Sequence, residues 1–67
     1  MRVQINGDPT ELPERTTVAD VVVASGASPD GRGVAVAIDG EVVPRADWDE
    51  PVRPEQRIEV LQAVQGG

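Results

Sequence analysis

In three stretches of the chain, the larger apolar residues mostly alternate with polar residues or alanines, and this period of two predicts half-buried strands. The stretches are residues 2–5, 34–38 and 57–64. The middle one, Val-Ala-Val-Ala-Ile, is the most apolar and predicts a core strand. In residues 18–22 the apolar residues recur at helical spacing instead, so a helix is expected there.

Two glycine turns add return strands to the first two stretches. Asn6-Gly7 and Asp39-Gly40 are strong signals of a type I′ hairpin, because that turn needs positive φ at both central residues. They predict antiparallel returns over residues 9–12 and 41–43. Pro9 cannot donate a hydrogen bond within a sheet, so its strand is expected at an edge.

The helix has its own start and stop signals. Thr17 is suited to cap the N-terminus, with Asp20 at the third helical position as in a capping box. Gly26 supplies a left-handed stop. Three consecutive valines make the helix intrinsically weak, so its stability has to come from packing against a sheet.

The predicted order is strand, strand, helix and three more strands, with a single helical turn over residues 46–50. One helix on a mixed sheet of about five strands is an α+β arrangement, and neighbouring first and last strands are expected, as in the ubiquitin-like β-grasp fold. Residues 1–64 would form this domain and residues 65–67 a flexible tail.

Trp48, the only aromatic residue, is interpreted as a structural plug of the core. The expected core consists of Val3, Ile5, Leu12, Val18, Val21, Val22, Val36, Ile38, Ile58 and Val60.

The charge balance narrows the choice of partners. Twelve acidic and six basic residues give a net charge of −6, which argues against nucleic acid and against an anionic membrane surface. The N-terminal residues lack the apolar region of a signal peptide, and no apolar run approaches the roughly 20 residues of a membrane span. A cytoplasmic protein is therefore expected, and the short, proline-marked strand edges favour a monomer.

The chain contains no Cys, His or Lys, and this excludes most catalytic chemistry. A thiolate nucleophile, an imidazole base and a Schiff-base amine are all missing. Asp47, Asp49 and Glu50 are too few for a calcium loop and are interpreted as a solvated acidic turn. The Asp-Gly-Arg-Gly segment at 30–33 lacks the context of a phosphate loop and is interpreted as a turn. No metal, no bound cofactor and no independent enzymatic activity are expected.

The sequence ends in Gly66-Gly67. Two residues without Cβ make a thin, flexible thread that can present the Gly67 carboxylate inside another protein's active site. An enzyme that uses ATP can convert this carboxylate to an acyl-adenylate, from which a sulfur or nitrogen nucleophile displaces AMP. The chain itself then needs no catalytic group. The alternative is an end that is frayed, as many termini are.

The last predicted strand leads into this tail. Strand alternation places Ile58, Val60, Gln62 and Val64 on one face, and Glu59, Leu61 and Ala63 on the other. If the first face is the core, Leu61 and Ala63 project outward and form an apolar patch where a partner docks. Two alternatives stay open: single exposed apolar residues are ordinary, and a bulge would turn Leu61 inward.

The whole chain resembles the ThiS family, the sulfur carrier proteins of thiamine biosynthesis. The resemblance rests on the order of elements, the run Val-Ala-Ile-Asp-Gly-Glu-Val-Val-Pro-Arg at 36–45, Trp48 soon after it, and the ending at 58–67. The small subunit of molybdopterin synthase shares the Gly-Gly ending, so the Gly-Glu-Val-Val-Pro-Arg run followed by Trp48 is what favours the thiamine branch. The chain departs from many relatives at residues 54–56, where Pro-Glu-Gln replaces a Gly-Asp turn.

The resemblance implies a β-grasp protein that is a co-substrate of other enzymes. An E1-like activating enzyme of the ThiF type would use ATP to adenylate Gly67, and sulfur from a persulfide donor would convert it to a thiocarboxylate. Thiazole synthase of the ThiG type would then take the sulfur to build the thiazole ring. Gly66 would be the flexible neighbour of the sulfur-carrying Gly67.

Three alternatives remain at this point. The first is a sulfur carrier for another pathway, such as molybdopterin or cysteine synthesis. The second is a non-covalent β-grasp binding module, for example one that binds RNA, although the net charge of −6 opposes it. The third is a protein tag that becomes conjugated to lysines.

Overall fold

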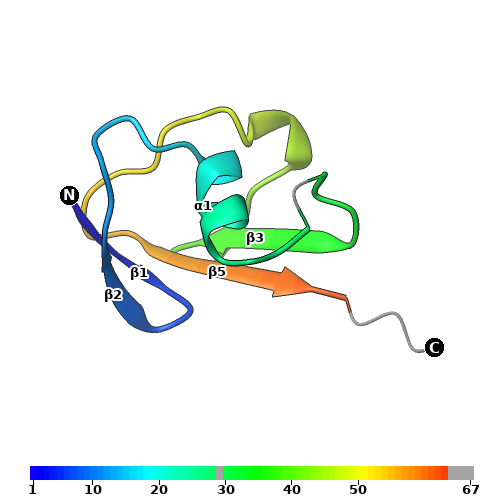
Figure 1. Cartoon of the computed structure of the whole chain (residues 1–67), viewed down its shortest axis with the longest axis horizontal. Coiled ribbons are helices and arrows are strands. Elements are labelled where there is room, and N and C mark those ends of the chain that lie inside the picture. The colour runs from blue at the N-terminus through cyan, green and yellow to red at the C-terminus, as the bar shows by residue number, and fades with distance from the viewer. Residues whose placement is uncertain (29, 64–67) are drawn as a thin grey trace.

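A five-stranded mixed sheet carries one helix across a single face, in a computed structural model that describes residues 1–28 and 30–63 (Figure 1). The elements are β1 (Arg2–Ile5), β2 (Asp8–Glu11), α1 (Val18–Ala24), β3 (Val34–Ile38), β4 (Glu41–Val42), the 3₁₀ turn η1 (Arg45–Asp47) and β5 (Arg57–Gln62). The strand order in the sheet is β2-β1-β5-β3-β4. This confirms the predicted α+β class and the β-grasp arrangement.

β5 is the central strand of this sheet. It runs parallel to β1, with Ile5 opposite Ile58, and antiparallel to β3. The pairing of the first and last strands is therefore confirmed. β5 ends at Gln62, two residues before the predicted end at 64, and Ala63 lies outside the strand. The proposed boundary between domain and tail, after residue 64, lies outside the described residues.

Both predicted hairpin turns form. Asn6 and Asp39 each have φ of 50°, and the glycines that follow have φ of 85° and 86°, as a type I′ turn requires. The return strands are slightly displaced from their predicted bounds, because β2 begins at Asp8 and β4 ends at Val42. Pro9 lies in the edge strand β2, where its missing N–H disrupts no ladder.

The start of α1 is fixed by its cap and by a distant loop. Thr17 and Asp20 form the predicted capping box, with Thr17 Oγ1 accepting from the Asp20 N–H at 3.1 Å and Asp20 Oδ2 accepting from the Thr17 N–H at 3.0 Å. The N–H groups of the first two helical residues donate to the carbonyls of Glu50 and Trp48, at 3.1 and 2.9 Å. The unsatisfied donors of the first turn are thereby paired, although the helix has only seven residues.

The core lies between α1 and the sheet. Its buried members are Val3, Val18, Val21, Val22, Val36, Trp48, Val52, Ile58 and Val60. Trp48 is 6% exposed, which confirms its interpretation as a plug. Ile5, Leu12 and Ile38 were predicted as core residues, and this was wrong. They are only partly buried and pack against the core from outside. Val52 was missed, because it stands in a proline-rich stretch without periodicity.

The 43–56 segment crosses over the top of the molecule in Figure 1. Its helical turn covers Arg45–Asp47, earlier than the predicted 46–50. The Val52 N–H donates to the Thr16 carbonyl at 2.8 Å, and Thr17 forms an isolated bridge with Pro51. Backbone contacts therefore hold this irregular segment against the start of α1.

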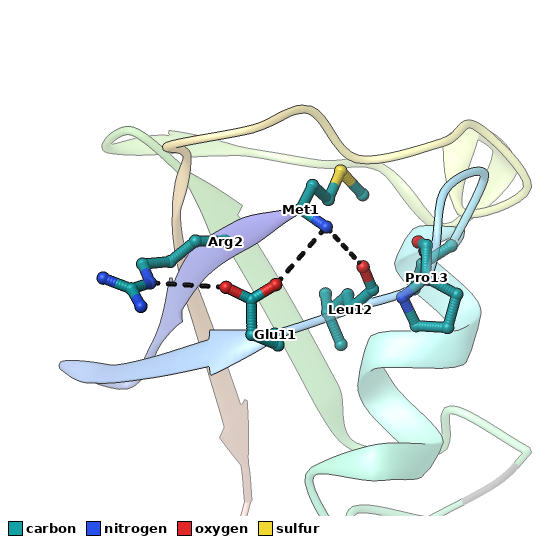
Figure 2. Close-up of polar contacts among 6 residues, drawn as sticks. Met1, Arg2, Glu11, Leu12 and Pro13 are labelled. Atoms are coloured by element: carbon teal, nitrogen blue, oxygen red, sulfur yellow. Dashed lines mark hydrogen bonds and ion pairs between the residues drawn. The ribbon is translucent and has the colours of Figure 1, made fainter.

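The amino group of Met1 joins the start of β1 to the end of β2 (Figure 2). It donates to the Leu12 carbonyl at 2.7 Å and lies 3.5 Å from Glu11 Oε2. Arg2 Nε lies 3.5 Å from the other oxygen of Glu11. Both of these side chains are mainly exposed, so the Arg2–Glu11 pair contributes little to stability.

Candidate functional site

The end of β5 is the part of the described chain that leads toward Gly66 and Gly67. Ile58 and Val60 point into the core, and Leu61 lies on the opposite face with 66% of its surface exposed. The pairing of β5 with β3 is regular through Gln62, so no bulge turns Leu61 inward. Ala63 is also exposed. The predicted outward placement of Leu61 is therefore confirmed. Ala63 is exposed but lies beyond the end of the strand, and the docking role of both residues stays a prediction.

The strand register places Leu61 within a wider apolar surface. Ala35 lies opposite Leu61, and Ala37 lies opposite Val42, all on the face of the sheet that α1 does not cover. Val42 is 75% exposed. We call these four residues (Ala35, Ala37, Val42 and Leu61) the outer-face patch. Sequence reasoning missed Ala35 and Val42, because only the register of β3 shows which residues lie beside Leu61.

A shallow hollow adjoins Leu61 on the β1 side. Its volume is about 510 Å³. Its lining consists of Gln4, Asn6, Gly7, Arg57, Ile58, Glu59 and Leu61. One cation and one anion line it together with amides and apolar atoms.

A second hollow lies at the other side of the strand end, where β5 meets the 28–33 loop. Ser28, Arg32, Gln62 and Ala63 line it, and its volume is also about 510 Å³. The Ala63 N–H donates to the Gly33 carbonyl at 2.7 Å. The chain is thus held by backbone bonding one residue beyond the strand. Gly66 and Gly67, the predicted sulfur-carrying end, lie outside the described residues.

Hydrogen bonds fix the shape of the turn at residues 30–33 and connect Ser28 to it. Asp30 Oδ1 accepts from the Arg32 N–H at 2.9 Å and from the Ser28 hydroxyl at 2.8 Å. These two bonds lower the pKa of Asp30 below its ordinary value of 3.8. The Val34 N–H donates to the Gly31 carbonyl at 3.1 Å. The interpretation of the 30–33 segment as a turn is confirmed.

Three kinds of feature are absent from the described residues: metal-ligand clusters, unpaired buried polar side-chain atoms and membrane-spanning helices. Among residues 1–28 and 30–63, no three His, Cys, Asp or Glu side chains gather as a metal site requires. Within the same ranges, every buried side-chain nitrogen and oxygen has a hydrogen-bond partner. Thr16, a buried polar residue, donates its hydroxyl to the Pro13 carbonyl at 2.6 Å. In the part of the chain that the structure describes, no helix is long and apolar enough to cross a membrane.

The model of the ThiS family matches residues 3–67, which is nearly the whole chain and includes the Gly-Gly ending. The chain belongs to the ThiS family. Members of this family are sulfur carriers and not enzymes. A sequence search among curated proteins returns no match.

Two solved structures are similar to this chain over its full length. A crystal structure of the thiamine biosynthesis protein ThiS from Geobacter metallireducens has 27% sequence identity and a TM-score of 0.78, and all of both chains is covered. A solution structure of a thiamine biosynthesis protein from the same organism has 27% identity and a TM-score of 0.80, with 88% of that chain covered. The five-stranded mixed sheet with one helix thus matches ThiS β-grasp structures.

Proposed function

We propose that this chain carries sulfur as a thiocarboxylate on Gly67 and delivers it for thiazole formation in thiamine biosynthesis. The observation that carries the proposal is the match of the ThiS family model through residue 67, because it aligns the terminal glycines with the family pattern. The absence of Cys, His and Lys from the sequence agrees with a co-substrate whose chemistry is supplied by partner enzymes.

The activation would take place in an E1-like enzyme of the ThiF type. The Gly67 carboxylate attacks the α-phosphorus of ATP, an acyl-adenylate forms, and pyrophosphate leaves. A persulfide sulfur then attacks the acyl carbon and displaces AMP. A thiol cleaves the resulting sulfur–sulfur bond and is itself oxidised to a disulfide, which leaves the thiocarboxylate on Gly67. The carrier contributes only its reacting carboxylate.

Partners would recognise the surface beside the tail. Leu61 lies on the face that α1 does not cover and belongs to the outer-face patch, and Ala63 is exposed just beyond the end of β5. Four residues follow Ala63, and a fully extended chain of four residues spans at most about 14 Å. An enzyme that receives Gly67 in its active site therefore has to dock close to Leu61 and Ala63.

The activation step can be tested with the purified chain, ATP, an E1-like activating enzyme and a persulfide donor. The expected result is AMP formation and a product that a thiocarboxylate-selective alkylating reagent traps on the C-terminal fragment. Trapping is needed because oxidation of Met1 or Trp48 changes the intact mass almost as much as exchange of oxygen for sulfur. A variant lacking Gly67 is the control. Absence of both AMP and adduct for the full chain would refute the proposal.

The pathway is tested separately with the thiocarboxylated chain. Thiazole synthase of the ThiG type should consume it, and molybdopterin synthase components should not. The reverse result would assign the chain to another sulfur pathway while leaving the carrier chemistry in place. RNA binding in a gel shift at low salt, unchanged when Gly66 and Gly67 are deleted, would support the binding-module alternative instead.

A further inference from the structure

The side chain of Asn6 extends the pairing between β1 and β5 beyond the end of β1. Asn6 Nδ2 donates to the Val60 carbonyl at 3.2 Å, and the Val60 N–H donates to Asn6 Oδ1 at 2.9 Å. The backbone of this region reaches β5 only as far as Ile58, whose carbonyl accepts from the Asn6 N–H at 2.8 Å. At Asn6 the chain leaves β1 and enters the hairpin turn. The Asn6 side-chain amide therefore makes the two bonds to Val60 that the backbone of a longer β1 would make.

A side-chain amide is suited to make both of these bonds. Val60 presents one donor and one acceptor to Asn6, and a side-chain amide offers one acceptor and a pair of donors. A carboxylate at position 6 would accept from the Val60 N–H but would place negative charge against its carbonyl. Asn also tolerates the φ of 50° that the turn imposes.

The two edges of β5 are held differently near its end. On one side β3 pairs with β5 as far as Gln62, and the Gly33 carbonyl accepts from Ala63. On the other side, the described pairing with β1 covers only the first two residues of β5, and the Asn6 amide bonds the strand at Val60. Val60 immediately precedes Leu61.

We propose that Asn6 is a positioning residue for the sulfur-carrying end. By holding Val60 on the β1 side, it fixes the direction in which Leu61 and Ala63 leave the sheet. A partner that docks on these two residues then meets the end of the strand in a defined orientation. This inference rests on the proposed function, since the geometry matters to a partner only if the tail enters its active site.

Asp39 offers a matched control at the opposite end of the same strand. It also has φ of 50° and precedes a glycine in a type I′ turn. Its N–H donates to the Arg57 carbonyl at 2.8 Å, and its Oδ1 accepts from the Arg57 N–H at 2.9 Å. Asp39→Ala therefore removes a comparable side-chain bond to β5, but at its first residue, far along the strand from the tail.

The test compares Asn6→Ala, Asn6→Asp and Asp39→Ala with the unchanged chain, under conditions where all four are folded. The first readout is hydrogen exchange at the Val60, Leu61 and Ala63 amides. Asn6→Ala should exchange there about tenfold faster, as expected when one or two hydrogen bonds are lost. Asn6→Asp keeps an acceptor for the Val60 N–H and should show a smaller increase. Asp39→Ala should leave these three amides unchanged. Equal exchange in Asn6→Ala and the unchanged chain would overturn the proposal.

The second readout is the rate of AMP formation with the activating enzyme. Asn6→Ala should lose about tenfold in kcat/KM, because a strand end that points in the wrong direction places the reacting carboxylate poorly in the partner's active site. Asn6→Asp should lose less. Asp39→Ala should stay within about twofold, because it leaves the bonds between Asn6 and Val60 in place. A purely structural defect in β5 would instead lower kcat/KM in both kinds of variant. Equal losses in both would overturn the positioning role. If the unchanged chain forms no AMP, the proposed function fails, and the exchange readout still decides whether Asn6 holds the strand end.

Discussion

The guanidinium of Arg45 stacks on the indole of Trp48, with 4.8 Å between Cζ and the ring centroid. The indole Nε1 donates to the Val43 carbonyl at 3.2 Å, so the ring is fixed at both its polar and its apolar side. Gly31 of the 28–33 loop is buried against this pair. The spacing of Arg45 and Trp48, on which the ThiS resemblance partly rests, thus has a structural role, because both side chains pack against Gly31. The same loop bonds Ala63 through the Gly33 carbonyl.

Gly31→Ala should destabilise the fold strongly. A Cβ at this position would collide with Nη1 of Arg45 and lie 2.9 Å from Cζ3 of Trp48, and the φ of +74° is itself strained for alanine. Strain and crowding together should cost about 3 kcal/mol of unfolding free energy. Fluorescence of Trp48 during urea unfolding measures this loss.

Gly40→Ala is the matched control for that substitution. Its φ of +86° is similar, but nothing lies within 4 Å of the added Cβ. It should therefore cost only the backbone strain, about 1–2 kcal/mol. Equal costs at both positions would show that the Arg45–Trp48 pair does not crowd the loop.

Thr17→Ala should weaken α1 at its N-terminus. The substitution removes the hydroxyl that accepts from the Asp20 N–H and leaves that donor without its partner. Loss of a Thr cap costs about 1 kcal/mol. Thr17→Ser keeps an acceptor and should restore most of the difference in the urea midpoint; failure of Ser to do so would point to lost methyl packing instead.

Acid should destabilise the protein partly through Asp20 and Asp30. The Thr17 N–H, and then the Thr17 side chain, lower the pKa of Asp20 below its ordinary value of 3.8. The Arg32 N–H and then Ser28 act in the same way on the pKa of Asp30. Because the folded pKa values are lowered, the stabilisation is complete above about pH 4 and is lost as the pH falls through the folded values.

The corresponding measurement is the unfolding free energy of the unchanged chain and of Asp20→Asn/Asp30→Asn between about pH 6 and pH 2. The double variant should show a shallower fall below about pH 4, because its amides do not titrate. Identical slopes for the two chains would exclude these carboxylates as contributors to acid denaturation.

Leu61→Ser should impair the reaction with the activating enzyme and leave the fold intact. Leu61 is 66% exposed, so its loss should change stability by no more than about 0.5 kcal/mol. If it contacts the partner, kcat/KM for AMP formation should fall about tenfold. Val23→Ser is the control, because Val23 is 56% exposed but lies on α1. A normal rate for Leu61→Ser would remove Leu61 from the docking surface.

Local signals in the sequence were sufficient for each element taken alone. Asn6-Gly7 and Asp39-Gly40 predicted their turns, because few other residue pairs accept positive φ twice in succession. Thr17 and Asp20 predicted the helix start, because both partners of the capping box lie within one turn of the chain. The period of two in residues 57–62 predicted the outward face of Leu61.

Contacts between segments that are distant in the chain could not be predicted from local sequence patterns. Val52 is buried in the core, its N–H donates to the Thr16 carbonyl, and no periodicity marks it. The outer-face patch depends on the register between β3 and β5, which a one-residue shift would have reversed. The pairing of Asn6 with Val60 joins residues 54 positions apart.

The sequence by itself determined the local conformations and the chemical character of this protein: where the chain turns, where the helix starts, and that its side chains include no Cys, His or Lys. The tertiary structure alone decided which residues surround the strand that leads to the tail. Local preferences act over a few neighbouring residues. The strand register, the packing of Gly31 against Arg45 and Trp48, and the hydrogen bonds of the Asn6 side chain arise only when separate segments pack on one core.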